Sequence, residues 1–171
     1  MKIAVNTRFL LSKKLEGIGH FTNETLKRIV RRHPEHQFIF FFDRPYSEEF
    51  IYADNIVPEV LFPPARHPFL WYWWFELSVP AVLKKHKADI FLSTDGYLSL
   101  RTDIPQVPVM HDLAVEHYPA EVNYLVSRYY RYFFPKFAKK AKRIATVSQF
   151  SKLDIEEKYQ NTNLLRNIYG N

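Results

Sequence analysis

The chain has 171 residues, of which 47% are hydrophobic and 17% aromatic, which is enough for one domain with a substantial core. It has no cysteine, which excludes disulfide bonds and thiolate chemistry, and its formal net charge of +6 favours an anionic partner. No apolar run reaches the roughly 18 residues that a membrane span needs, and the start of the chain lacks a signal-peptide pattern. We therefore expect a cytoplasmic protein.

The first predicted element is a short strand followed by two glycines and a helix. Residues 3–5 are apolar, as in a strand buried on both faces, and the chain is polar again by Arg8. Gly17 and Gly19 then precede a helical pattern that ends before Pro34. A glycine loop here either brings the backbone close to an anionic ligand at the start of the helix or only allows a tight turn.

Further apolar runs predict strands at residues 37–42, 57–62, 88–93, 106–110, 143–147 and 163–169. Helices are predicted at residues 69–87, where Pro80 should kink or divide the helix, at residues 120–141, and in a segment that ends near Lys158. Strands that alternate with helices predict an α/β fold. We expect a Rossmann-like, doubly wound and mainly parallel sheet of about seven strands, with helices on both faces, in a single domain over residues 1–171.

An aromatic run lies within the second predicted helix. Residues 71–74 are consecutive aromatics, so at least one must point away from the core. Trp71 and Trp73, with Lys84 and Lys85 further along, suit an anionic membrane surface or a greasy acceptor. Ordinary packing under a neighbouring loop explains the same pattern.

Polar residues follow most of the predicted strands, and they define a candidate site. They are Arg8, Asp95, His111, Asp112 and Ser148. In a doubly wound sheet, ligands bind at the carboxyl ends of the strands, where these residues should gather. His111 can donate or accept a proton near neutral pH, or it can simply bridge two loops. Ser148 or Ser151 can cap the helix that follows.

Several kinds of site are not indicated. His111 and His117 are six residues apart without a third ligand at a suggestive spacing, so we expect no metal. The sequence has no phosphate-binding P-loop, no serine nucleophile elbow and no complete dinucleotide motif. It also lacks an RNA-binding aromatic motif and a helix-turn-helix signature, so nucleic acid is not an expected partner.

Four segments together resemble the N-terminal domain of a retaining, GT-B-fold glycosyltransferase of family 4 (group 1). Residues 6–8 and 17–21 resemble the family's opening Asp-Ala-Arg and Gly-Ile-Gly-Arg-Tyr, with Asn6 and His20 as departures. Residues 109–113 and 118–119 resemble its His-Asp-Leu segment and the proline after it. Residues 144–151 resemble its Thr-Val-Ser-x-x-Ser segment, and residues 167–171 resemble the end of its last N-terminal strand.

The resemblance implies transfer of a sugar, with retention of anomeric configuration, from a nucleotide-sugar donor to a glycan, lipid-linked or other cell-envelope acceptor. It implies that Gly17 and Gly19 approach the donor, that His111 contacts the transferred sugar, and that Ser148 and Ser151 line the same edge. Arg8, Asp95 and Asp112, which follow predicted strands, are the other expected donor- or acceptor-binding residues. Such enzymes typically need no metal. Many relatives act on membrane-linked acceptors, so the resemblance also supports a peripheral position at the inner face of the membrane.

The resemblance covers only one half of the GT-B architecture. These enzymes have a second Rossmann-like, donor-binding domain with a paired-glutamate segment, and this chain has no counterpart of it. We therefore expect an acceptor-side domain that is inactive without a C-terminal domain. The alternative is a stand-alone, non-catalytic α/β module that binds a nucleotide or another anionic partner.

Overall fold

The computed structural model describes residues 1–12, 14–159 and 166–167. Its main sheet has five strands in the order β3-β2-β1-β4-β5, and every neighbouring pair is parallel. They are β1 (Lys2–Asn6), β2 (Gln37–Phe42), β3 (Ile56–Val60), β4 (Ile90–Ser93) and β5 (Gln106–Pro108). The strand order reverses between β1 and β4, as in a doubly wound sheet, so the predicted α/β class is confirmed.

The main sheet has fewer strands than the seven or so that the sequence predicts. The next two strands, β6 (Ala145–Thr146) and β7 (Arg166–Asn167), form a separate parallel pair, joined to the main sheet by one bridge between Val109 and Ala145. The short β5 ends at Pro108, which has no N–H to donate, and this limits the ladder. The other residues of the predicted strand at 163–169, and residues 170–171, lie outside the described residues.

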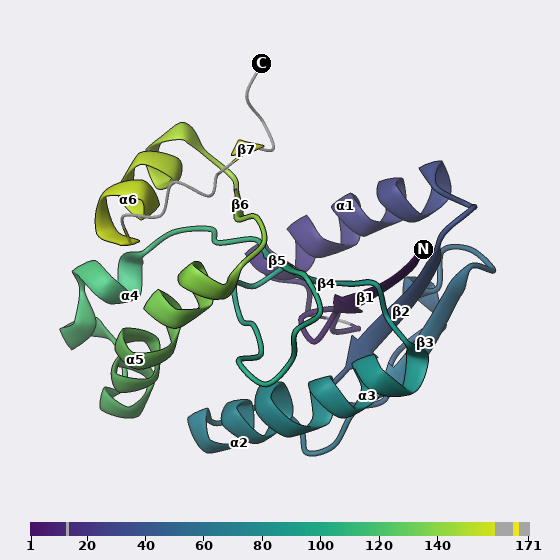
Figure 1. The fold of residues 1–171 in the computed structure, drawn as a ribbon, viewed down its shortest axis with the longest axis horizontal. Helices are drawn as coiled ribbons and strands as arrows, with labels where there is room; N and C mark the ends of the chain where they lie inside the picture. The colour runs from purple at the N-terminus through teal and green to yellow at the C-terminus, as the bar shows by residue number, and fades with distance from the viewer. Residues whose placement is uncertain (13, 160–165, 168–171) are drawn as a thin grey trace.

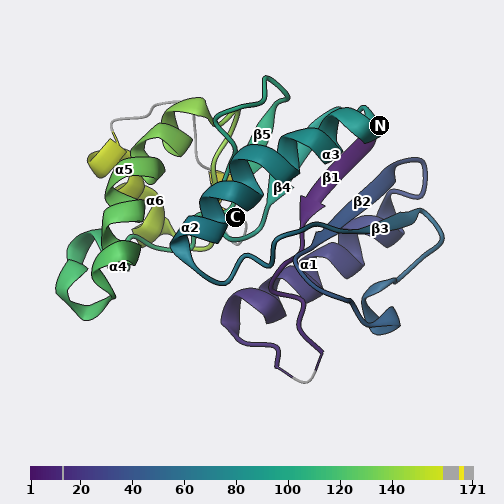
Figure 2. The same cartoon turned by 90° about the horizontal axis from the view of Figure 1, so that it is seen from below.

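Strand β2 shows why the sheet is covered on both faces. Its three phenylalanines at even positions pack in one apolar cluster with Leu26 and Val30 of α1 (Gly17–Arg32). Its odd-numbered residues, Ile39 and Phe41, pack in a second cluster with Leu83 of α3 (Val79–His86). Because successive side chains of a strand point to opposite faces, an unbroken apolar run requires helices on both sides. Figures 1 and 2 show α1 on one side of the sheet and α3 on the other.

The second helical region is divided, but the break begins before Pro80. It consists of α2 (Pro68–Trp73), a π-helical turn η2 (Trp74–Ser78) and then α3. Pro80 lies in the first turn of α3, where its missing N–H is tolerated.

The remaining helices gather on the side of the molecule away from the N-terminus (Figure 1). They are α4 (Ala114–His117), the 3₁₀ turn η3 (Pro119–Glu121), α5 (Tyr124–Lys140) and α6 (Gln149–Tyr159), and a further 3₁₀ turn, η1 (Glu48–Phe50), links β2 to β3. The helix predicted at residues 120–141 starts later because Asn123 caps it, accepting a hydrogen bond from the amide of Leu125 at 2.9 Å. Among the described residues, every helix is too short or too polar to cross a bilayer.

Gly17 and Gly19 lie in the first turn of α1, so the prediction that they form a loop before the helix is wrong. A Cβ atom at Gly19 would lie 2.7 Å from the carbonyl oxygen of Phe9, whereas a Cβ atom at Gly17 would meet nothing within 4 Å. Gly19 therefore lets the helix approach the segment that follows β1. Gly17 has no such constraint.

We expect Gly19→Ala to lower the free energy of unfolding by about 1–3 kcal/mol, since the backbone at Phe9 must move. Gly17→Ala is the matched control in the same helical turn, and it should leave the stability unchanged or raise it by up to about 1 kcal/mol. Urea unfolding of both variants measures the difference. Equal stability of the two variants would show that the close approach at Phe9 carries no cost.

Candidate active site

The carboxyl ends of β1 and β4 meet where the strand order reverses, and a buried ion pair lies there. Nε of Arg8 donates to the carboxylate of Asp95 at 2.6 Å, and the two side chains are only 5% and 1% exposed. Asp95 also accepts hydrogen bonds from Nδ2 of Asn6 at 2.8 Å and from the hydroxyl of Ser93 at 2.9 Å. These neighbours hold the carboxylate in one orientation.

The guanidinium of Arg8 lies among aromatic rings. Its central carbon lies 4.3 Å from the ring centroid of Tyr97, 5.2 Å from that of Phe75 and 5.9 Å from that of Trp71. Burial alone would lower the pKa of Arg8, but the charge of Asp95 and the hydrogen bond to it outweigh burial and raise that pKa. Arg8 is therefore a permanent cation, held in place by its neighbours, at the point where the strand order reverses between β1 and β4.

The four residues predicted to form a membrane or acceptor surface, Trp71, Trp73, Lys84 and Lys85, do not lie in one environment. Trp71 is half-buried, donates from Nε1 to the carbonyl oxygen of Ala65 at 2.9 Å, and helps to enclose Arg8. Trp73 is 54% exposed. Lys84 and Lys85 are both exposed, and Lys85 is paired with Glu59 at 2.7 Å. Trp71 thus belongs with the buried ion pair, because the helix turns it inward.

The imidazole ring of His111 is held in place by a hydrogen bond and by an aromatic contact. Its Nε2 lies 2.8 Å from the carbonyl oxygen of Thr94, the residue before Asp95. A carbonyl oxygen can only accept, so Nε2 carries the proton in this contact and the lone pair of the ring lies on Nδ1. The ring of Phe21 from α1 meets the imidazole edge-on, with centroids 4.9 Å apart.

The two predicted serines hold the backbone around His111. The hydroxyl of Ser148 accepts from the amide of Ser151 at 3.0 Å, so Ser148 caps α6. The hydroxyl of Ser151 donates to the carbonyl oxygen of His111 at 2.8 Å. Asp112 is exposed, and it accepts from the amide of Ala114 at 2.9 Å, which caps the turn into α4. These three side chains therefore shape the backbone around the imidazole.

Two cavities open at this edge of the sheet. One, of about 360 Å³, is lined by residues that include Arg8, Arg44, Arg66, Trp71, Asp95 and Tyr97. The other, of about 370 Å³, is lined by Phe9, Leu11, Lys14, Glu16, Gly17, Ile18 and Gly19. The cavities share Phe9, Leu11 and Ile18, so they run along the same edge. Neither lining, as formed by the described residues, includes His111.

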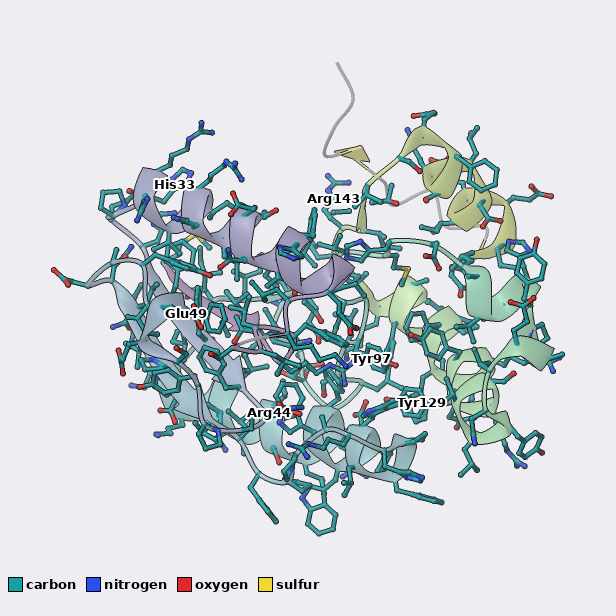
Figure 3. The ribbon with its side chains drawn as sticks, turned by 180° about the vertical axis from the view of Figure 1, so that it is seen from behind. His33, Arg44, Glu49, Tyr97, Tyr129 and Arg143 are labelled. Atoms are coloured by element: carbon teal, nitrogen blue, oxygen red, sulfur yellow. The ribbon has the colours of Figure 1, made fainter. Side chains whose placement is uncertain are left out.

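Sequence reasoning left several residues of the first cavity out of the candidate site, among them Asp43, Arg44 and Tyr97. Asp43, at the end of β2, is buried and receives Nε and Nη2 of Arg44 at 2.6 and 2.7 Å. This pairing raises the pKa of Arg44, so its charge is retained. Tyr97 lines the same cavity and packs against Tyr129, with ring centroids 5.7 Å apart (Figure 3). The position of Asp43 directly after a buried strand was the available signal.

A group of three possible metal ligands occurs at one place among the described residues, in the loop between α1 and β2. That loop directly precedes β2, so it lies at the amino end of that strand, opposite the carboxyl ends where the cavities open. The cavities at the strand ends hold carboxylates that are already paired with arginines or, for Glu16, with Lys14, which leaves them poorly suited to a metal.

Comparison with known proteins gives one family and one fold. The family model for Glycosyltransferase Family 4 matches residues 15–167. A glycosyltransferase from Rickettsia africae ESF-5 has a similar solved structure, with a TM-score of 0.56 and 13% sequence identity. The match covers 97% of this chain and 42% of that protein, so this chain spans less than half the length of its structural relative. No curated protein sequence matches the chain. The family model covers most of the chain, which therefore belongs to Glycosyltransferase Family 4.

Proposed function

We propose that this chain is the acceptor-side domain of a retaining glycosyltransferase. It would transfer a sugar from a nucleotide-sugar donor to a glycan, lipid-linked or other cell-envelope acceptor, together with a C-terminal, donor-binding domain. The observation that carries the proposal is the buried pair of Arg8 and Asp95, which lines the first of two adjoining cavities at the carboxyl ends of the strands. Ligands of doubly wound sheets bind at this place.

The second cavity is suited to the donor phosphates. It includes the first turn of α1, whose N-cap residue Glu16 makes no side-chain capping bond. Free N–H groups and the helix dipole favour an anion at such a position. Lys14 lines the same cavity, although it is paired with Glu16 at 3.2 Å. A phosphate could replace that carboxylate as the partner of Lys14.

The first cavity is suited to an acceptor sugar. Aromatic rings stack on the faces of sugars, and charged side chains bind hydroxyl groups. Tyr97 and Trp71 supply the rings, and Arg44 and Arg66 supply donors. Catalysis would then consist mainly of positioning and of charge stabilisation by groups that are already fixed, with His111 next to the transferred sugar.

A membrane-linked acceptor has a possible approach along α5. A groove of about 690 Å³ is lined by Tyr124, Arg128, Arg131 and Tyr132 among others, and a second of about 470 Å³ shares Arg128 and Tyr132 with it. Tyr124 and Tyr132 are 70% and 58% exposed. Exposed aromatic rings beside arginines suit an anionic membrane interface.

We expect the double variant Arg128→Gln/Arg131→Gln to bind anionic vesicles about 30-fold more weakly, since each cation near such a surface contributes about 1 kcal/mol. The control is Lys84→Gln/Lys85→Gln on α3, where Lys85 is already neutralised by Glu59. Vesicle co-sedimentation compares the two. Equal binding by both variants and the unaltered chain would rule out the α5 surface.

The proposed function is tested by a paired transfer assay. The chain is mixed with the polypeptide that carries the donor-binding domain, and nucleotide release from a panel of nucleotide sugars is followed with candidate acceptors. Activity that requires both pieces is the expected result. If the panel gives no activity while the chain alone binds nucleotide, the non-catalytic module is the better description.

A further inference from the structure

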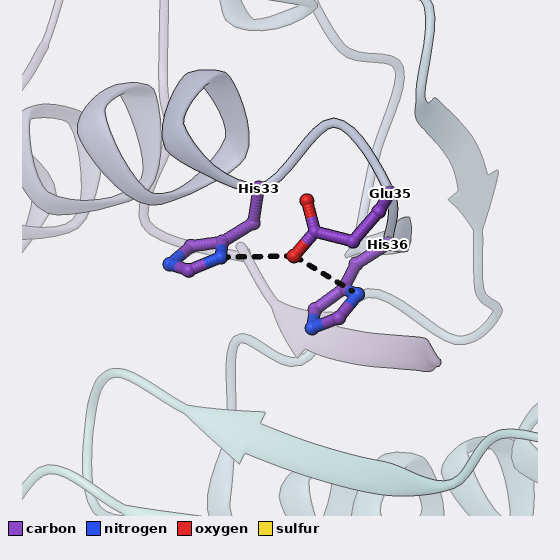
Figure 4. A group of neighbouring side chains, drawn as sticks. All are labelled: His33, Glu35 and His36. Carbon is purple, nitrogen blue, oxygen red and sulfur yellow. Dashed lines mark hydrogen bonds and ion pairs between the residues drawn. The ribbon is translucent and has the colours of Figure 1, made fainter.

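The loop between α1 and β2 brings two histidines and a glutamate together. Nδ1 of His33 lies 3.1 Å from Oε1 of Glu35, and Nδ1 of His36 lies 3.6 Å from the same oxygen. The three ligand atoms all lie within 4.8 Å of one another. Figure 4 shows both imidazoles turned toward the carboxylate. The rings are nearly parallel, with an interplanar angle of 16°.

We propose that His33, Glu35 and His36 bind a zinc ion, with water as the remaining ligand. Zinc prefers imidazole nitrogen and carboxylate oxygen in tetrahedral geometry, with metal–ligand distances near 2.0–2.1 Å. Two ligands of such a tetrahedron lie about 3.3 Å apart. The two distances to Glu35 bracket this value, and the ligand atoms of the two histidines lie within 4.8 Å of each other. Rotation of the exposed His33 side chain would bring its ligand nitrogen to the spacing that zinc requires.

The unused bonding capacity of His36 favours this assignment. Its Nδ1 is buried and makes no hydrogen bond, although it lies next to the Glu35 carboxylate. A buried polar atom without a partner costs free energy, which a metal bond would recover. A neutral imidazole presents a lone pair to a metal at this nitrogen when its proton is on Nε2.

The backbone of the loop is already fixed. Nδ2 of Asn55 donates to the carbonyl oxygens of His33 and His36 at 3.2 and 3.0 Å. The amide of His36 also donates to the carbonyl oxygen of His33 at 3.1 Å. Little backbone ordering is therefore left for metal binding to impose, which raises affinity.

The charges around the site act in both directions. The loop follows the carboxyl end of α1, where the helix dipole favours a cation. Arg31 and Arg32, in the last turn of α1, oppose a cation but are exposed to solvent and screened. The ionised carboxylate of Glu35 supplies the local negative charge.

The position of the loop indicates a structural zinc ion, independent of sugar transfer. His36 precedes β2, whereas Asp43 follows it, so the strand separates the two ends by roughly 20 Å. Figure 3 likewise shows His33 at a distance from Tyr97. Zinc here would tie the end of α1 to the start of β2 and stabilise the folded chain.

Isothermal titration of the chelator-treated, 171-residue chain with zinc chloride tests the proposal. We expect one saturable site, and an increase of several degrees in Tm when zinc is in excess. His33→Ala and Glu35→Gln should abolish both effects, and both residues are exposed, so neither change should unfold the chain. Cobalt(II) should give the visible absorption of a tetrahedral site in the unaltered chain only.

His117→Ala is the matched control, because His117 also pairs with a carboxylate, that of Asp154 at 2.8 Å, but belongs to no group of three possible ligands among the described residues. It should bind zinc as the unaltered chain does. Absence of saturable binding, or equal binding by His33→Ala and the unaltered chain, would overturn the proposal.

Discussion

Asp95→Ala is expected to lower the free energy of unfolding by about 3–5 kcal/mol, because it leaves Arg8 buried without its partner. The guanidinium cannot lose its proton to escape the cost, since its pKa lies far above neutral pH. The variant also frees the amide of Asn6 and the hydroxyl of Ser93, which both donate to Asp95. Urea unfolding of the chain measures the change.

Two comparisons separate the effect of burial from the effect of the ion pair itself. Glu16→Ala removes the partner of Lys14 in an exposed pair, and its cost should stay within about 0.5 kcal/mol. The double variant Arg8→Met/Asp95→Leu removes both charges and should be much more stable than Asp95→Ala alone. If Asp95→Ala and Glu16→Ala were equally mild, Arg8 would have access to water and the site would not be enclosed.

His111→Ala is expected to reduce sugar transfer in the paired assay by about 100-fold or more, which corresponds to ~2.7 kcal/mol of transition-state stabilisation. The imidazole makes one described hydrogen bond, to Thr94, so its loss should cost only about 1 kcal/mol of folding stability. The large loss of activity would therefore come from the reaction and not from unfolding.

His117→Ala serves as the control for His111→Ala, because His117 is exposed and lies on the same segment. It should retain the activity of the unaltered chain. If the two variants transferred sugar at equal rates, the reacting sugar would have to lie away from His111, in the cavity around Arg8.

Much of the fold could be predicted from the pattern of apolar residues. The run at β2 has six residues, of which five are fully buried, and such a run fits only a strand covered on both faces. The strand pairing at the other end could not be predicted so well. The apolar runs near Val109 and Ala145 both resemble strands of the main sheet. Because Pro108 has no N–H to donate, the hydrogen-bonded pairing between them is reduced to one bridge, from Val109 to Ala145.

The candidate site was predictable as a set of positions, but the contacts within it were not. Arg8 and Asp95 each follow a strand, which gave their place, whereas their pairing depends on β1 and β4 being neighbours. Trp71 looks like a surface residue because it is one of five consecutive aromatics, and only tertiary packing turns it toward Arg8. Gly19 looks like a loop residue, although it is a contact point between α1 and the backbone at Phe9.

The measurement that tests the central claim most directly is the rate of sugar transfer by Arg8→Met/Asp95→Leu in the paired assay. This variant replaces the buried charges with apolar groups of similar size, so it separates the site from the stability of the fold. If transfer takes place beside this ion pair, the variant should remain folded and lose about 100-fold or more in rate. A folded variant with full activity would contradict the account and place the reaction elsewhere on the strand edge.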